Sequence, residues 1–333
     1  MEIRKIQKTG FSTYIISLPK SWIVKKNLKS GDKLNIIEEK DQSLRICTDY
    51  KDPLKKEVYI KIDNQTNIDE FLRKITSYYL NGATNITIET TENKELFKKI
   101  PVNIKRFMGF EIVEQTENKI IIQDFFSSEN LSLIKTIRRA YNISKMIIEE
   151  SKLILNKEVK NLNNLLEWEE ELDKLYLFLR REINFAILNS HILRNFEITL
   201  KEAQDYLLLI DAIEKISDVF FTIAELGLKV EKISEKSLKK INYIYDRINE
   251  SYNISFSTIF KKNFDTANKN YEKIKEILKF NINIHEENLD EKSKENLYMI
   301  ISNIFTIINY LEENNIDFIN LNFDNKGYEI LPK

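Results

Sequence analysis

The sequence predicts a multidomain α+β protein with an N-terminal β-rich domain, a small α/β middle domain and a C-terminal all-α bundle. Three of the four prolines lie before residue 102, and from there to Asn325 the chain has no proline and only Gly109 and Gly227. Proline and glycine interrupt helices, so long helices are permitted only in this later stretch. Apolar residues alternate early in the chain and recur every three or four residues later, which separates strands from amphipathic helices.

The first fifty residues read as short strands around one short helix. Apolar residues alternate up to Pro19, and a turn is expected at Gly31. The predicted elements are a strand over 14–18, a helix over 21–27 with Trp22 and Val24 facing inward, and strands over 33–38 and 43–48. So short a β segment buries little core alone, and we therefore expect a homodimer.

This segment is strongly basic although the whole chain has a net charge of only −1. Residues 1–35 carry eight lysines or arginines against Glu2 and Asp32. Such a local excess suits the phosphates of DNA, whose contacts are independent of base sequence and weaken steeply with salt. The alternatives are that these side chains only keep a small dimer soluble, or that the domain serves only for dimerisation.

Three successive runs in this segment resemble the AbrB/SpoVT swapped-hairpin DNA-binding domain. They are RKIQKTG at 4–10, YIISLPKSW at 14–22 and LKSGDKL at 28–34. The resemblance implies that two chains interleave their hairpins into one dimeric β-barrel, covering residues 1–50, and that basic side chains on it contact DNA. By position the candidates are Arg4, Lys5, Lys8 and Lys20, with Lys25 and Lys26 as further possibilities.

The middle domain, residues 54–125, alternates strand and helix patterns. The predicted order is strand 57–63, helix 67–80, strand 85–89, helix 94–107, and strands 110–114 and 119–123. It has neither a glycine-rich loop that could bind phosphate nor a cluster of histidine and acidic residues. We interpret it as a spacer or a dimer-contact domain.

The third domain, residues 127–315, is predicted to be helical throughout, followed by a tail over 316–333. Ser127 or Ser128 can cap the first helix. The predicted helices cover 128–156, 161–195, 200–231, 235–262, 265–282 and 290–314. Two three-helix units are the natural grouping of these segments.

Two acidic pairs interrupt the apolar stripes of consecutive helices in this domain. Glu169 and Asp173 form the first pair, and Glu214 and Asp218 the second. Like charges at i, i+4 destabilise a helix, and buried carboxylates need a cation or a raised pKa, so a metal ion is one explanation. The alternative is that they are ordinary rim carboxylates, facing water or paired with Lys174, Arg180, Lys201 or Lys215.

The runs WEEELDKL at 168–175 and LIDAIEKISD at 209–218 resemble the acidic motifs of PhoU proteins. Those are phosphate-uptake regulators built from paired three-helix bundles, whose Glu/Asp-x-x-x-Asp motifs hold iron or zinc clusters. An AbrB-like domain joined to a PhoU-like bundle resembles archaeal phosphate regulators. The resemblance therefore implies a phosphate-responsive transcriptional regulator, with iron or zinc at Glu169, Asp173, Glu214 and Asp218, and with a phosphate transporter subunit or a sensor kinase as a further partner.

The second helical unit departs from that pattern. Residues 298–310 contain no aspartate or glutamate. Glu272 and Glu276 are either a surviving half of a second motif or ordinary residues of a solvated face. We therefore expect at most one metal site.

Other functions are compatible with only part of this pattern. A helical adaptor that docks a transporter or kinase without binding DNA is the main alternative. A carboxylate-bridged di-iron enzyme would need Glu-x-x-His, and neither His191 nor His285 has a glutamate three residues earlier. Cys47 has no activating histidine nearby and is assigned to packing. We therefore predict a protein that is not an enzyme.

The sequence also gives an expectation about location. Residues 1–9 are charged and lack an apolar signal region, and the apolar stretch 299–310 is interrupted by polar residues. We therefore expect a cytoplasmic protein without membrane insertion.

Overall fold

The computed structural model describes residues 3–38, 42–48, 56–90, 92–126, 132–231, 233–261, 263–279 and 289–321. The chain divides into two compact units, residues 1–55 and 56–333. The candidate capping residues Ser127 and Ser128, together with His285, lie outside the described residues.

The first unit consists of two β-hairpins and one short helix. Its elements are β1 (Gln7–Thr9), β2 (Thr13–Ile15), α1 (Lys20–Lys25), β3 (Asn35–Glu38) and β4 (Leu44–Cys47). Each hairpin is antiparallel, and the two form separate two-stranded sheets. The first turn begins at Gly10, whose φ of +66° suits glycine. Within one chain the hairpins do not close a barrel, so closure stays a prediction about two chains.

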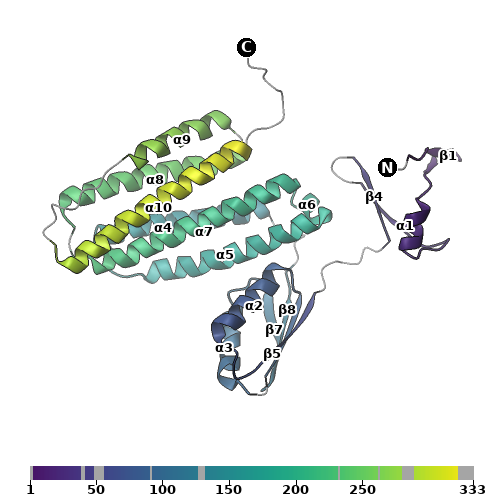
Figure 1. The fold of residues 1–333 in the computed structure, drawn as a ribbon, viewed down its shortest axis with the longest axis horizontal. Coiled ribbons are helices and arrows are strands. Elements are labelled where there is room, and N and C mark those ends of the chain that lie inside the picture. Colours follow the sequence, from purple (N-terminus) through teal and green to yellow (C-terminus); the bar gives the residue numbers. More distant parts are fainter. Residues whose placement is uncertain are drawn as a thin grey trace, which may run out of the picture. The chain divides into compact units, whose positions relative to one another are not determined.

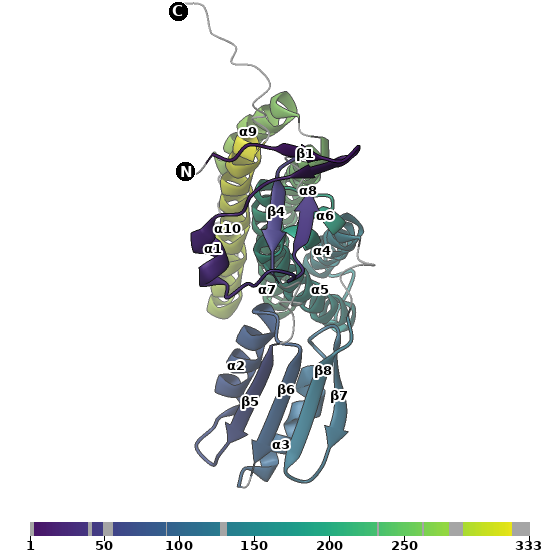
Figure 2. The same ribbon diagram turned by 90° about the vertical axis from the view of Figure 1, so that its right-hand side faces the viewer.

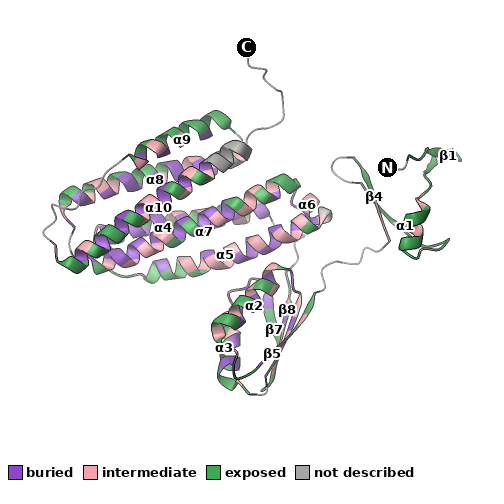
Figure 3. Cartoon of the chain, viewed as in Figure 1, coloured by how far each residue is buried: buried purple, intermediate pink, exposed green. Residues whose placement is uncertain are grey.

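None of the side chains described in this unit is buried, as Figure 3 shows. Val24 is 64% exposed, so its predicted inward position is wrong for the single chain, whereas Trp22 is half-buried. The physical reason is that one chain supplies no second layer against which α1 could pack. The apolar side chains left in solvent include Ile6, Phe11, Tyr14, Ile36 and Leu44.

The α/β part of the second unit matches the predicted order of elements closely. Its elements are β5 (Glu57–Ile62), α2 (Ile68–Leu80), β6 (Asn85–Thr90), α3 (Lys94–Ile104), β7 (Phe110–Gln115) and β8 (Lys119–Asp124). The strands form one mixed sheet in the order β5-β6-β8-β7, with β5 and β6 parallel and the other pairs antiparallel. Asn67 and Asn93 cap the two helices through their side-chain oxygens.

One face of this sheet is covered by helices. Ile86 and Ile88 of β6 and Ile120 and Ile122 of β8 are fully buried, as expected for alternate residues on one side of a strand. They share a core with Phe71 and Ile75 of α2, among other residues. Figure 2 shows α2 and α3 behind the sheet, with its other face open.

The rest of the unit is helical. The helices are α4 (Leu133–Leu155), α5 (Asn163–Leu188), α6 (Ser190–Asn195), α7 (Leu200–Lys229), α8 (Glu235–Lys261), α9 (Phe264–Leu278) and α10 (Glu291–Leu321). Helices α4, α5 and α7 contact one another, as do α8, α9 and α10, while α7 also packs along α10 (Figure 1). The two groups of three predicted from the sequence therefore share one continuous hydrophobic core.

Two predicted boundaries in the bundle are wrong. The single helix expected over 161–195 is interrupted at Asn189, which has extended backbone angles and donates a side-chain hydrogen bond to Phe185 O at 2.9 Å. Asparagine has a low helix propensity and is favoured at helix ends, and Asn189 is both the C-cap of α5 and the N-cap of α6. In addition, α10 continues to Leu321, so the predicted tail begins inside a helix.

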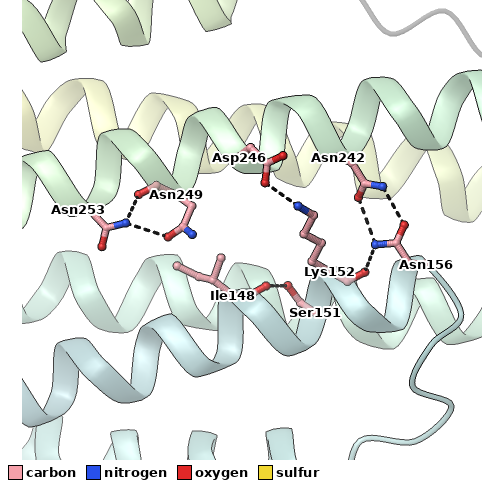
Figure 4. A network of polar contacts seen from close by, with 8 residues as sticks. All are labelled: Ile148, Ser151, Lys152, Asn156, Asn242, Asp246, Asn249 and Asn253. Carbon is pink, nitrogen blue, oxygen red and sulfur yellow. Dashed lines mark hydrogen bonds and ion pairs between the residues drawn. The ribbon is translucent and has the colours of Figure 1, made fainter.

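Polar contacts join α4 to α8 across the two groups of helices (Figure 4). The ammonium of Lys152 lies 2.5 Å from an oxygen of Asp246. The side-chain amides of Asn156 and Asn242 donate to each other at 2.8 and 3.3 Å. Reciprocal amide pairs of this kind satisfy both groups at once, which helps to fix the relative position of the two helices.

The α/β part and the bundle belong to the same compact unit because α5 packs on the α/β core. Leu177 of α5 is buried in that core. Its neighbour Arg181 forms a buried ion pair with Asp124 at the end of β8, and its guanidinium lies 4.7 Å from the ring centre of Tyr79 and 5.5 Å from that of Phe110. The middle part is therefore firmly joined to α5, whereas the sequence suggested a separate domain.

Gly109 gives the first stability prediction. Its φ is +90°, and a Cβ there would lie 2.7 Å from Asp124 Oδ1 and 2.8 Å from Phe126 Cβ. Replacement by alanine therefore adds a steric clash to backbone strain, and we expect a loss of about 2–4 kcal/mol in urea unfolding. Gly82→Ala is the control, since it has a φ of +78° but would meet only the Phe185 ring, at 3.3 Å. Equal losses in the two variants would contradict the assigned clash.

Candidate functional site

The predicted DNA-contacting residues are all exposed. Arg4 and Lys5 lie shortly before β1, Lys8 lies within it, and Lys20 is the first residue of α1. In the first hairpin Lys8 is directly opposite Tyr14, whereas the neighbouring pair joins Gln7 to Ile15. Successive residues of a strand point to opposite faces, so Lys8 and Ile15 lie on different faces of the hairpin. The face that carries Lys8 and Tyr14 is therefore distinct from the face that carries Gln7 and Ile15.

The acidic residues predicted as metal ligands meet where α5 and α7 pack together. Oxygen atoms of Glu169, Asp173 and Asp218 all lie within 4.8 Å of one another. Glu169 and Asp173 are half-buried, whereas Asp218 is exposed. Two motifs about 45 residues apart in sequence therefore form one group, because i, i+4 residues share a helix face. This acidic triad could hold a metal ion.

Glu214, the fourth predicted ligand, lies beside the triad. Partial burial, followed by the charges of Asp218 and Asp173, raises the pKa of the Glu214 carboxyl to about 7. The pKa of Asp218 is also raised, chiefly because the surrounding protein removes part of its hydration. The two side chains share a hydrogen bond. A proton on Glu214 can thus take the place of a cation at neutral pH.

Asp173 has a counter-ion that sequence reasoning missed. Arg106, two residues after the end of α3 in the α/β part, places its Nη2 atom 3.7 Å from Asp173 Oδ2. The Nε atom of Arg106 is buried and has no hydrogen-bond partner within the described residues. Burial raises the pKa of the Asp173 carboxyl, and the Arg106 charge opposes this shift. No local signal in the sequence indicates this pairing, because the two residues belong to different parts of the fold.

The alternative interpretation pairs the acidic residues with Lys174, Arg180, Lys201 or Lys215, but among the described residues the structure shows none of these ion pairs. Lys174 binds Glu170 at 2.9 Å, and Arg180 binds Asp211 at 2.8 Å. Neither Lys201 nor Lys215 forms an ion pair with any residue that the structure describes. None of these four residues thus forms an ion pair with a predicted ligand, although the charge of Glu214 acts on Arg180.

The chemistry of the donors limits the metals that would fit. All the candidate ligand atoms are carboxylate oxygens, which suit hard divalent cations that accept several oxygen ligands and water. Zinc in structural sites prefers sulfur and nitrogen. The triad therefore fits a hard cation, while iron or zinc stays a prediction. Among the described residues, the acidic triad is the one group of this kind. Glu272 and Glu276 are exposed and do not belong to it.

The remaining sequence predictions concern residues away from these groups. Cys47 is half-buried, and its Sγ atom lies 3.9 Å from Asn35 O. The side chain of His191 is outside what the structure describes, so the di-iron alternative is not tested there. Among the described helices, none combines the length and the apolar character that crossing a membrane requires.

These features define a chain with a hairpin domain that exposes basic residues and a helical bundle that holds an acidic triad. Residues 7–56 match the family model described as "Antidote-toxin recognition MazE, bacterial antitoxin". The N-terminal unit thus contains a domain of the MazE/AbrB type, and DNA binding is the function that this type of domain suggests. Comparison with curated proteins and with solved structures finds no match. The family match ends before the bundle, so the likeness to PhoU remains a prediction.

Proposed function

We propose that this protein is a DNA-binding regulator that acts as a homodimer and carries a metal-responsive helical bundle. The observation that carries the proposal is the swapped-hairpin domain at residues 7–56, with Arg4, Lys5, Lys8 and Lys20 exposed in or beside it. Apolar side chains left in solvent on one chain, such as Ile6 and Leu44, support dimerisation, since a second chain would cover them.

The second part of the proposal concerns the signal. The two acidic motifs that resemble PhoU converge on one group, as a shared metal site would require. On this basis we propose control of phosphate uptake, with a phosphate transporter subunit or a sensor kinase as the partner of the bundle. The bundle would act by binding and not by catalysis, so we propose no enzymatic activity.

DNA binding has a direct test. Replacing Arg4, Lys5 and Lys8 together with alanine should weaken binding of a fluorescent mixed-sequence duplex. The slope of log affinity against log salt should fall by about 0.9 for each phosphate that these side chains neutralise. Lys98, Lys99 and Lys105 are exposed residues of the α/β part, and replacing them with alanine removes the same charge. This control should leave the slope unchanged.

The outcome also separates the two candidate functions. If the unaltered chain shows no binding to any duplex at low salt, the regulator proposal is wrong and the helical adaptor remains. If the two triple variants weaken binding equally, the DNA contacts do not lie in the N-terminal unit.

A further inference from the structure

The open face of the four-stranded sheet has no described element packed on it. Alternate residues of each strand point to this face, away from α2 and α3 (Figure 2). On the edge strand β5 these are Glu57, Tyr59 and Lys61, and all three are exposed. Along this edge strand the face is thus exposed to solvent.

Strand register arranges the side chains of this face in three rows across the sheet. The first row contains Glu57, Asn85, Gln123 and Glu111; the second contains Tyr59, Thr87, Ile121 and Glu114; the third contains Lys61, Glu89 and Lys119. The middle row contains the large apolar side chains of this face. Tyr59 is 75% exposed, and Ile121 is half-buried. Glu114, at its far end, is offset by Lys119 of the same chain at 3.8 Å.

Charge differs between the two outer rows. The first row ends in Glu57 and Glu111 and contains no basic residue, whereas the third contains Lys61 and Lys119 beside Glu89. The face therefore has an acidic end and a more basic end, with an exposed tyrosine between them. Opposite charges on two sides of an apolar centre are what a self-complementary contact requires.

We propose that this face binds the same face of a second copy of the chain, about a two-fold axis that runs across the strands along the middle row. Rotation about that axis places Glu57 over the partner's Lys61 and brings the two Tyr59 side chains together. A two-fold axis along the strands would instead leave each row over itself, which sets both Glu57 residues against Glu111 of the other copy and both Glu89 residues against Lys119. The first arrangement sets only one acidic residue, Glu114, against its own copy, and Glu114 is already paired with Lys119. Charge therefore selects the first arrangement.

The N-terminal domain explains why the second copy is available. A face of four strands and six residues measures roughly 400 Å², about half of what each partner buries in a standard interface. Such a contact is weak alone. Dimerisation through residues 7–56 would tether two copies by one short segment each, which raises their effective concentration to about the millimolar range. The inference thus rests on dimerisation but not on DNA binding.

Cross-linking of the full chain tests the arrangement. Cys47 is first replaced by serine, and Tyr59→Cys is then introduced at the centre of the proposed contact. A short bis-maleimide should join two chains, since packed sheets lie about 10 Å apart. Val102→Cys on α3 is the matched control, because Val102 is 71% exposed and lies on the helical side. We expect severalfold more cross-linked dimer from Tyr59→Cys.

Charge reversal supplies the second measurement. Adding Lys61→Glu should lower cross-linking through Tyr59→Cys, because it would face Glu57 of the other copy, and adding Glu57→Lys as well should restore it. The proposal would be overturned if Tyr59→Cys gave no more cross-linked dimer than the Val102→Cys control. It would also be overturned if Lys61→Glu left the yield from Tyr59→Cys unchanged. A mass of four chains in sedimentation would overturn the two-chain arrangement. DNA binding should be unchanged in every variant, which separates this inference from the proposed function.

Discussion

Replacement of Arg181 by methionine should lower the unfolding free energy of the second unit by about 3–5 kcal/mol. The side chains of Arg181 and Asp124 are only 6% and 9% exposed. Burial alone would lower the pKa of the Arg181 guanidinium, but the hydrogen bond and charge of Asp124 raise it. Methionine keeps much of the volume and the contact with Tyr79, yet it leaves the Asp124 carboxylate buried without its counter-ion. Urea unfolding followed by circular dichroism measures the loss.

Two variants show whether the unpaired charge causes this loss. Adding Asp124→Asn to Arg181→Met should recover part of the stability, because the buried carboxylate is then neutral and its Oδ1 can still accept from Phe126 N. Arg139→Met is the control at an exposed pair, since the Arg139 side chain is 61% exposed beside Glu171. It should cost at most about 1 kcal/mol. A similar cost at both arginines would contradict a structural role for the buried pair.

Metal loading should reverse the effect of Asp218→Asn on thermal stability. In chelator-treated protein the substitution should raise the melting temperature, because it removes one charge from a group of like charges. With Mn²⁺, Fe²⁺ or Zn²⁺ at about 100 times its dissociation constant, the unfolding free energy of the unaltered protein should rise by about 2.7 kcal/mol. The variant should not show this gain. This corresponds to a shift of several degrees for a chain of this size. Differential scanning fluorimetry measures both states.

The metal-free comparison should also depend on pH. The pKa of Glu214 is about 7 in the folded protein, above its ordinary value of 4.5, so the folded state binds the proton more tightly than the unfolded state. Stability therefore falls as the pH rises from about 4.5 through 7. The gain from Asp218→Asn should accordingly be larger at pH 8 than at pH 5.

Glu170→Gln is the control for the acidic triad. Glu170 lies next to Glu169 on α5 but is exposed and bound to Lys174. Its substitution should not alter the response to metal. If Asp218→Asn is at least as stable as the unaltered protein in the presence of each metal, the acidic residues are ordinary surface charges and the bundle is a docking scaffold.

Local patterns in the sequence were sufficient for most of the secondary structure. The strand predicted over 85–89 is β6 (Asn85–Thr90), and the helix over 200–231 is α7 (Leu200–Lys229), which begins with a capping box formed by Thr199 and Glu202. These elements follow from periodicity and capping, which depend on neighbours only a few residues apart. The same reasoning placed each acidic pair on one helix face, and α5 and α7 bring the pairs together.

Only the tertiary structure decided which residues from distant segments meet. Arg106 reaches Asp173 from the α/β part, and Arg181 pairs with Asp124, although neither arginine carries a signal that separates it from other arginines in the sequence. Periodicity specifies which face of an element is buried but not which other element covers it. A cation beside the acidic pairs could therefore be expected from the sequence, but Arg106 could be identified only in the folded chain.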